Sequence, residues 1–370
     1  MTRRYKVLTT VLVLIAVALT SLALLLSHNA PCGAAQTAPT DTPTMKAVVY
    51  RCYGSPDVVK LEDVAKPTPA DGRVLVKVHA ASVNPLDWHY MRGDPYIMRA
   101  GVGLGTPNDT RLGVDFAGTV EAVGKNVTRF KPGDEVFGGK GGAFAEFVSV
   151  RDEGALVLKP ANLTFEQAAA VPVAAVTALQ ALRDQGKLQP GQKVLINGAS
   201  GGVGTFAVQI AKALGADVTA VCSTRNVELV RSLGADHVID YTHEDYTKGG
   251  HSYDLILDAV GNRPLLENRH VLSPSGIYIG IGGGRPSDGG FIGPLIGPIK
   301  ELVLSPFVSQ KFVTFEAELN KEDLTILSDL MQAGKVTPVI DRRYKLSDTA
   351  EAIRYLEQGH ARGKVVITLE

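Results

Sequence analysis

Residues 193–204 carry the pattern with the most specific chemistry in this chain. They read Lys-Val-Leu-Ile-Asn-Gly-Ala-Ser-Gly-Gly-Val-Gly, a strand that runs into a glycine-rich turn at which a helix begins. Glycines let the backbone approach a pyrophosphate, and free N–H groups at the helix start face the anion. A turn that needs glycine only for its backbone geometry is the alternative. The expected dinucleotide contacts are Gly198, Ala199, Ser200, Gly201, Gly202, Val203 and Gly204.

The end of the next strand indicates which dinucleotide is preferred. A site for NAD usually has Asp or Glu there, about 20 residues further on, to bond the ribose 2′-hydroxyl. This chain has Cys222-Ser223-Thr224-Arg225-Asn226 instead. Ser223 offers a hydroxyl, and the guanidinium fork of Arg225 can bind two phosphate oxygens. The sequence therefore predicts NADPH rather than NADH, with an exposed charge at a helix start as the alternative interpretation of Arg225.

Strand and helix patterns alternate around this loop, which indicates βαβ units and a parallel sheet. The expected strands cover 193–197, 217–222, 237–240, 255–260 and 277–281, and the expected helices 202–214 and 227–233. Helical patterns at 323–333 and 347–358 then precede a terminal strand at 364–369.

Short strand patterns with glycine and proline turns dominate residues 45–150, and they favour a compact β-rich domain. The chain thus divides into four parts. These are a signal or anchor segment with a linker over 1–44, a β-rich domain over 45–170, a dinucleotide-binding domain over 171–319 and a C-terminal segment over 320–370.

An uncharged run from Val7 to Leu26 follows three basic residues at the N-terminus. Twenty helical residues rise about 30 Å, the thickness of a bilayer's hydrocarbon core. The apolar region of a signal peptide is usually about 7–15 residues. We therefore expect a single membrane anchor through residues 7–26, with export after cleavage of a signal peptide as the alternative. The positive-inside tendency favours a body outside the cytoplasm, but the side stays open.

Composition excludes some classes of function. The chain has 370 residues, and its 38 basic and 38 acidic residues give no net charge, so nothing predicts binding to nucleic acid. Its three cysteines, Cys32, Cys52 and Cys222, are too scattered for a disulfide framework or a metal knuckle. The glycine- and proline-rich segment 282–306 could line a substrate cleft, touch a membrane or be a plain connection.

The chain resembles the medium-chain dehydrogenase/reductase superfamily, in its zinc-independent quinone oxidoreductase-like branch. The resemblance covers about residues 45–370. It implies a GroES-like catalytic domain beside a Rossmann domain, an active site between them, a C-terminal return to the catalytic domain, and a homodimer. The residues that carry it are Ala80–Asp87, Gly113–Gly118, Lys131–Val136, the loop that begins at Gly198, and Leu233–Asp236.

Two positions depart from the zinc-dependent relatives. Those relatives have Cys where Asn84 stands and Gly-His-Glu where Gly113-Val114-Asp115 stands. Zinc prefers Cys, His or carboxylate ligands, so neither Asn84 nor Val114 suits it. The resemblance therefore implies that both catalytic and structural zinc are absent.

The resemblance also implies further cofactor contacts, at Tyr241 after the third strand and at Lys364 near the C-terminus. Thr177 and Val260 would lie near the nicotinamide half. The alternatives are a surface aromatic residue for Tyr241, a solvated charge for Lys364, and ordinary helix and strand residues for the other two.

The expected reaction is hydride transfer from NADPH to a quinone or an α,β-unsaturated carbonyl compound. The negative charge then lies on a delocalised oxygen that needs only hydrogen-bond donors or a proton source. Asn84 is the candidate to bind that oxygen or the nicotinamide ribose, and Tyr96 is the candidate proton donor. The alternative for Asn84 is turn formation, and the alternative for Tyr96 is packing under its loop. Other readings of the whole chain are an NADPH-binding sensor or scaffold without turnover, and a zinc-type alcohol dehydrogenase.

Overall fold

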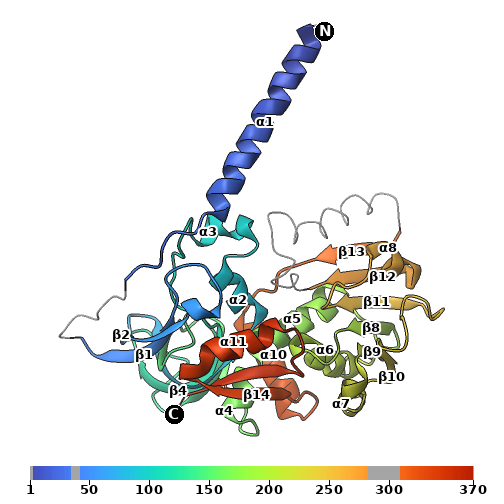
Figure 1. Cartoon of the computed structure of the whole chain (residues 1–370). Helices are drawn as coiled ribbons and strands as arrows, with labels where there is room; N and C mark the ends of the chain where they lie inside the picture. The colour runs from blue at the N-terminus through green and yellow to red at the C-terminus, as the bar shows by residue number, and fades with distance from the viewer. Residues whose placement is uncertain (1–2, 35–41, 282–308, 370) are drawn as a thin grey trace.

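The structure is a computed structural model of the whole chain, and it describes residues 3–34, 42–281 and 309–369. The whole of segment 282–306 therefore lies outside the described residues. Figure 1 shows β8–β13 on one side of the body, β1, β2, β4 and β14 on the other, and α1 extending away from both.

Six parallel strands form one sheet, in the order β10-β9-β8-β11-β12-β13. They are β8 (Lys193–Asn197), β9 (Asp217–Cys222), β10 (His237–Asp240), β11 (Tyr253–Asp258), β12 (Leu272–Gly280) and β13 (Lys311–Thr314). The chain runs outward from β8 to β10 and then returns to place β11 on the other side of β8. Ligands of such sheets bind at this reversal, outside the carboxyl ends of the strands. The predicted parallel α/β sheet is confirmed.

Short and mostly buried helices accompany this sheet. Small side chains let α5 and α6 approach closely, since α5 buries Ala174, Ala175 and Ala178. The helices are α4 (Phe165–Ala169), α5 (Pro172–Gln180), the π-turn η3 (Ala181–Gln185), α6 (Gly202–Ala213), η4 (Thr224–Asn226), α7 (Val227–Ser232), α8 (Leu265–His270) and α10 (Lys321–Gln332).

A second sheet is mainly antiparallel and has the order β14-β15-β3-β4-β5-β7, with β6 paired to β3. Its strands are β3 (Arg73–Val83), β4 (Asp115–Val123), β5 (Glu135–Gly139), β6 (Phe147–Arg151), β7 (Leu156–Leu158), β14 (Ile340–Lys345) and β15 (Lys364–Thr368). β15 pairs antiparallel with β3, and Val365 lies opposite Val83. This register brings Lys364, the next residue back along β15, to the end of β3 where Asn84 follows.

Smaller elements complete the GroES-like part. Its core packs Trp88 and Met91 from α2 against Phe116 and Phe144. The elements are the hairpin β1 (Thr44–Val49) and β2 (Lys60–Ala65), the turns η1 (Pro56–Val58), η2 (Tyr96–Met98) and η7 (Leu346–Asp348), and the helices α2 (Pro85–Arg92), α3 (Arg99–Val102) and α11 (Thr349–Glu357).

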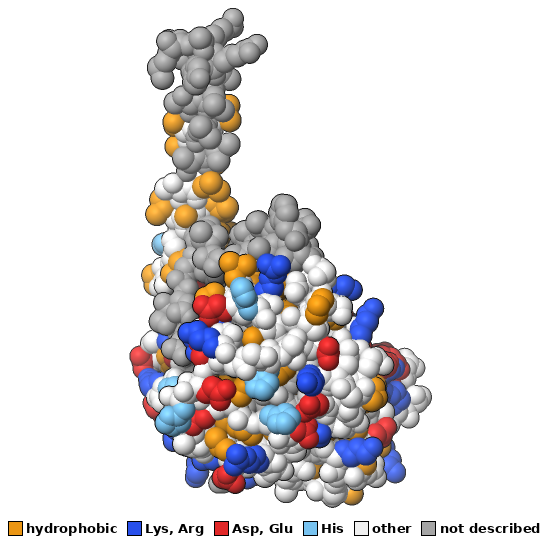
Figure 2. Space-filling model, turned by 90° about the vertical axis from the view of Figure 1, so that its right-hand side faces the viewer, with side chains coloured by type: hydrophobic (Ala, Val, Ile, Leu, Met, Phe, Trp, Pro, Cys, Tyr) orange, Lys and Arg blue, Asp and Glu red, His pale blue; other side chains and the backbone are white. Residues whose placement is uncertain are grey.

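The N-terminal segment forms α1 (Arg3–Ser27), and Figure 2 shows hydrophobic side chains exposed along its described part. Within the described ranges, no helix has both the length and the apolar character needed to cross a bilayer. The predicted membrane-spanning segment over 7–26 is therefore not supported. The far end of α1 packs on the body instead, where Leu26 is only 1% exposed.

The contacts that hold this end of α1 were not foreseen from the sequence. Arg99 is buried, and one guanidinium nitrogen donates to the carbonyl oxygens of Leu26 (3.0 Å) and His28 (3.2 Å) and to Asn29 Oδ1 (2.9 Å). Cys32 forms a disulfide with Cys52, although the sequence interpretation expected three cysteines too scattered for a disulfide framework. Spacing in the sequence could not reveal this bond, because the fold brings the two Cα atoms to 4.7 Å.

Reduction of this disulfide is expected to destabilise the protein by about 3 kcal/mol, since it closes a loop of 20 residues in the unfolded chain. Urea unfolding with and without a thiol reductant measures the change. The Cys32→Ser variant is the control, because reductant should then have no further effect. Equal stability of the oxidised wild type and Cys32→Ser would contradict the expectation.

Candidate active site

The glycine-rich loop follows β8 and leads into α6 at the reversal point of the parallel sheet. Gly198 has a φ of 83°, and a Cβ on Gly204 would lie 2.1 Å from the Gly198 carbonyl oxygen, so both positions require glycine. Ala199 N–H donates to Val221 O (3.1 Å), which fixes the loop beside β9. The first N–H groups of a helix have no partner within it. Gly202, Val203 and Gly204 open α6 and so present such groups for an anion.

The predicted contacts for a 2′-phosphate cluster at the end of β9. Asn226, which the sequence interpretation did not select, donates through Nδ2 to Ser200 Oγ (2.9 Å) and Ser223 Oγ (3.2 Å). Arg225 is exposed and donates to His360 O (2.9 Å) in the segment before β15. The structure thus brings loop, β9 and C-terminal residues together here.

Two further predicted contacts lie beside this region. Tyr241 N–H donates to Cys222 O (3.0 Å), and its side chain is 46% exposed next to the end of β9. Val260 is 45% exposed, and its Cγ2 lies 2.8 Å from where a Cβ on Gly198 would stand. Asp258 holds that turn by accepting from the N–H groups of Val260 (2.9 Å) and Gly261 (2.8 Å). Asp258 is a positioning residue that the sequence interpretation missed.

A buried ionic cluster joins the two parts of the body. The Lys364 ammonium donates to Asn84 Oδ1 and lies 3.3 Å from Asp115 Oδ2, while both ionic side chains are almost fully buried, at 3% and 0% exposed. Asn84 Nδ2 and Ser82 Oγ also donate to that Asp115 oxygen, each at 2.9 Å. A Cβ on Gly202 would lie 3.2 Å from Lys364 Cδ, so this cluster adjoins the glycine-rich loop.

Asn84 and Lys364 are thus brought together, and the roles predicted for them stay predictions, while Asp115 and Ser82 were missed. A buried aspartate within an apolar strand is the signal that could have found Asp115, because a buried charge needs a partner. Lys364 has three N–H donors, and the two acceptors in this cluster leave the third without an acceptor among the described residues.

Asp87 lies beneath this cluster and is fully buried in α2. Its carboxylate accepts from the N–H groups of Asn84 (2.7 Å) and Gly113 (3.1 Å). Burial raises the pKa of Asp87 from 3.8 to about 7, and the neighbouring Asp115 carboxylate adds to the rise, whereas the Asn84 N–H opposes it.

This raised pKa predicts a pH dependence of stability. The folded chain binds the Asp87 proton more tightly than the unfolded chain, so that contribution is complete below about pH 4 and is lost as the pH rises through about 7. Urea unfolding of the wild type and Asp87→Asn from pH 5 to 8 measures it. The wild type should lose stability relative to the variant over this range, and a constant difference would contradict the assignment.

α5 connects this cluster to a second polar network. Val173 N–H donates to Asp115 Oδ1 (3.0 Å), and Thr177 Oγ1 donates to Val173 O (2.7 Å), so Thr177 lies one helical turn from the cluster. The hydroxyl of Thr177 is engaged with its own helix. The structure therefore places Thr177 near the site, and its contact with the cofactor stays a prediction.

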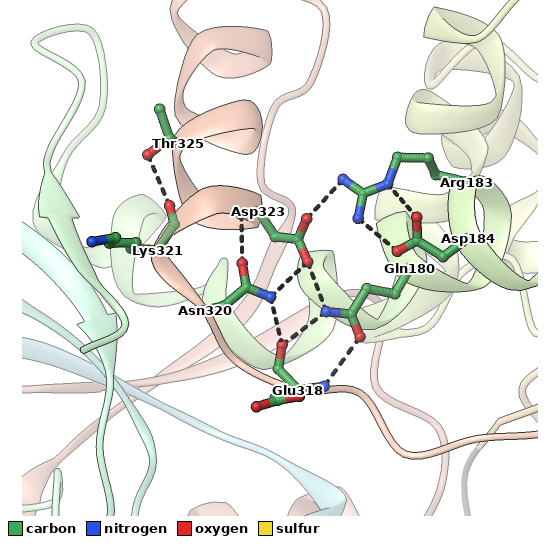
Figure 3. Close-up of polar contacts among 8 residues, drawn as sticks. All are labelled: Gln180, Arg183, Asp184, Glu318, Asn320, Lys321, Asp323 and Thr325. Atoms are coloured by element: carbon green, nitrogen blue, oxygen red, sulfur yellow. Dashed lines mark hydrogen bonds and ion pairs between the residues drawn. The ribbon is translucent and has the colours of Figure 1, made fainter. Parts of the chain in front are cut away.

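At the far end of α5, Gln180 holds the chain that leaves the parallel sheet (Figure 3). Its amide bonds both the carbonyl oxygen (2.8 Å) and the N–H (3.1 Å) of Glu318, and it donates to Asp323 Oδ2 (2.7 Å). Arg183 also contacts the Asp323 carboxylate at 2.7 Å. Hydrogen bonds therefore hold α5 at both ends, and they fix the distance between the Asp115 cluster and the segment around Glu318.

Tyr96 is not brought to the cluster by any contact in the described residues. Its ring lies over the Arg99 guanidinium, with the Arg99 Cζ atom 4.5 Å from the ring centre. Tyr53 lies over the same guanidinium at 4.3 Å. This arrangement corresponds to the packing alternative for Tyr96, and its role as proton donor stays a prediction.

Comparison with known proteins places this geometry in a family. The profiles described as "Alcohol dehydrogenase GroES-like domain" and "Zinc-binding dehydrogenase" match residues 70–161 and 233–367. A mouse protein named "NAD(P)H oxidoreductase RTN4IP1, mitochondrial" is 36% identical, over 88% of this chain and 89% of its own length. The chain belongs to the medium-chain dehydrogenase/reductase superfamily.

Two further relatives are named as a reductase and as a quinone oxidoreductase. A tomato (Solanum lycopersicum) protein, "2-methylene-furan-3-one reductase", is 36% identical over 87% of this chain and 79% of its own length. The solved quinone oxidoreductase from Coxiella burnetii is 30% identical, with a TM-score of 0.77, and covers 89% of this chain and all of its own. The predicted quinone oxidoreductase-like branch is confirmed.

One matching profile is named for zinc, but the residues at the two positions where zinc-dependent relatives have ligands are Asn84 and Val114, and a valine side chain has no ligating atom. Throughout the described part of the chain, no group of three or more His, Cys, Asp or Glu side chains could hold a metal ion. The absence of zinc stays a prediction, which metal analysis of the purified protein tests.

Proposed function

We propose that this oxidoreductase uses NADPH to reduce a quinone or the C=C bond of an α,β-unsaturated carbonyl compound. The observation that carries the proposal is the buried cluster of Lys364, Asn84 and Asp115, which adjoins the glycine-rich loop. Close backbone contacts allow only glycine at position 204 of that loop. The named reductases of enones and quinones among the relatives support this substrate class.

The residues around the loop fit NADPH. Gly204 lets the start of α6 pack closely against the loop, and Ser200, Ser223 and Arg225 gather donors where a 2′-phosphate would lie. NADPH, when bound, supplies a hydride from its nicotinamide C4. The preference for NADPH over NADH is part of the proposal.

Within this proposal the chain itself provides charge and orientation. Lys364 presents a buried cation whose remaining N–H can stabilise a developing enolate or quinol oxygen. Asn84 donates to Asp115 and accepts from Lys364, so it orients the ammonium rather than offering its own donors to substrate. A protonated ammonium suits an oxygen that gains charge on reduction, whereas alcohol oxidation needs a base.

Asn84→Ala is expected to lower kcat for enone reduction by about 10- to 100-fold, because Lys364 loses its oriented acceptor. The affinity for NADPH should change less than about threefold, since the loop and the serines are untouched. Steady-state kinetics with a 2-alkenal and fluorescence titration with NADPH measure the two effects. Unchanged kcat would remove Asn84 from the mechanism, and absence of turnover in the wild type with tight NADPH binding would favour a sensor or scaffold.

We also propose that the mature protein keeps residues 26–32. Cleavage after residue 29 would remove Leu26, His28 and Asn29, which together accept three hydrogen bonds from the buried guanidinium of Arg99. The Cys32–Cys52 disulfide is typical of oxidising compartments and supports export of the body. Mass analysis of the N-terminus of the native protein tests this.

A homodimer remains a further proposal, which light scattering tests.

A further inference from the structure

Asn226 joins two segments that no local pattern connects. It is 4% exposed, and it is the last residue of η4, the turn after β9. Its Nδ2 contacts Ser200 of the glycine-rich loop and Ser223 at the end of β9, at 2.9 and 3.2 Å. The side chain does not cap α7 by a hydrogen bond, so helix formation does not explain its placement.

The direction of these bonds decides what the serines can do. An amide nitrogen only donates, so both serine oxygens accept from Asn226 and each hydroxyl keeps its own O–H donor. Neither hydroxyl finds an acceptor of its own within the described ranges. Asn226 Oδ1 is buried without a hydrogen-bond partner there, so the two serine oxygens are the groups that hold this amide side chain.

We propose that Asn226 is a specificity-determining positioning residue, which presents Ser200 and Ser223 as two hydroxyl donors for the 2′-phosphate of NADPH. The inference rests on the proposed use of NADPH. A phosphate accepts hydrogen bonds only, whereas the ribose 2′-hydroxyl of NADH is usually held by an acidic acceptor. Arg225, held beside the pair by His360 O, adds positive charge.

Substitution of Asn226 separates this role from general folding. In Asn226→Ala the affinity of the full chain for NADPH should fall about tenfold, and that for NADH less than about threefold. Asn226→Asp keeps the shape but turns both hydroxyls inward and adds a negative charge, so it should weaken NADPH further and leave NADH nearly unchanged. Thr242→Ala is the matched control, because Thr242 bonds Thr224 and Asp240 but neither serine.

The experiment is calorimetric titration of each variant with NADPH and with NADH. A double-mutant cycle shows whether Asn226 acts through the serines, since it should have no further effect on the NADPH-to-NADH affinity ratio in Ser200→Ala/Ser223→Ala. A wild-type preference for NADPH that survives both Asn226 substitutions would overturn this inference alone. Equal wild-type affinities for NADPH and NADH would overturn the proposed NADPH preference and the inference with it.

Discussion

Lys364→Met should lower the free energy of unfolding by about 3–5 kcal/mol and abolish most reductase activity. The substitution keeps the length of the side chain but leaves the Asp115 carboxylate, at 0% exposed, without its cation. Removing one partner of a buried ion pair is costly because the remaining charge stays desolvated. Urea unfolding and steady-state reduction of a 2-alkenal by NADPH measure the two effects.

The double variant Lys364→Met/Asp115→Asn separates stability from chemistry. With both charges removed, most of the lost stability should return, because Val173 N–H can still donate to the amide oxygen at position 115, and the Ser82 hydroxyl can accept from the amide nitrogen that replaces the other carboxylate oxygen. Activity should stay low, because the cation that faces the substrate oxygen is missing. Recovery of activity together with stability would show that Lys364 has only a structural role.

Gly204→Ala should destabilise the apoprotein by several kcal/mol and prevent NADPH binding. The added methyl group would lie 2.1 Å from Gly198 O and 2.7 Å from two Ala199 backbone atoms, which a rigid loop between strand and helix cannot accommodate. Thermal unfolding and NADPH titration of the variant measure both losses.

Gly201→Ala is the matched control for that substitution. Its added methyl group would lie 3.4 Å from Gly198 O, an ordinary contact, and the residue has a φ of −82°. The apoprotein should therefore keep its stability within about 1 kcal/mol, whereas the methyl group can still hinder a pyrophosphate. Equal stability losses in Gly201→Ala and Gly204→Ala would contradict the loop geometry described above.

The sequence predicts those parts of the site that depend on neighbouring residues. The loop from Gly198 to Gly204 lies between a strand and a helix because glycine spacing and apolar periodicity act locally. For the same reason the five expected parallel strands and the helices α6 and α7 lie within about five residues of their expected positions, whereas the edge strand β13 was not predicted.

The rest of the site depends on contacts between distant segments. Lys364 reaches Asn84 only because β15 pairs with β3 in one register, and no local pattern specifies that register. Asn226 reaches Ser200, and Cys32 reaches Cys52, through turns whose paths follow from packing. Tyr96 differs from these residues, because its predicted role followed from its chemistry alone and not from a contact. In the structure its ring packs on Arg99, since a cation attracts the face of an aromatic ring.

Transfer of a labelled hydride tests the central claim most directly. The purified chain would be incubated with NADPH carrying deuterium at the transferred C4 position and with a 2-alkenal, and the product analysed by mass spectrometry and NMR. The account predicts a saturated aldehyde with one deuterium on its β-carbon for each NADPH oxidised. NADPH oxidation without deuterium on that carbon, or no oxidation with either a 2-alkenal or a 1,4-quinone, would contradict it.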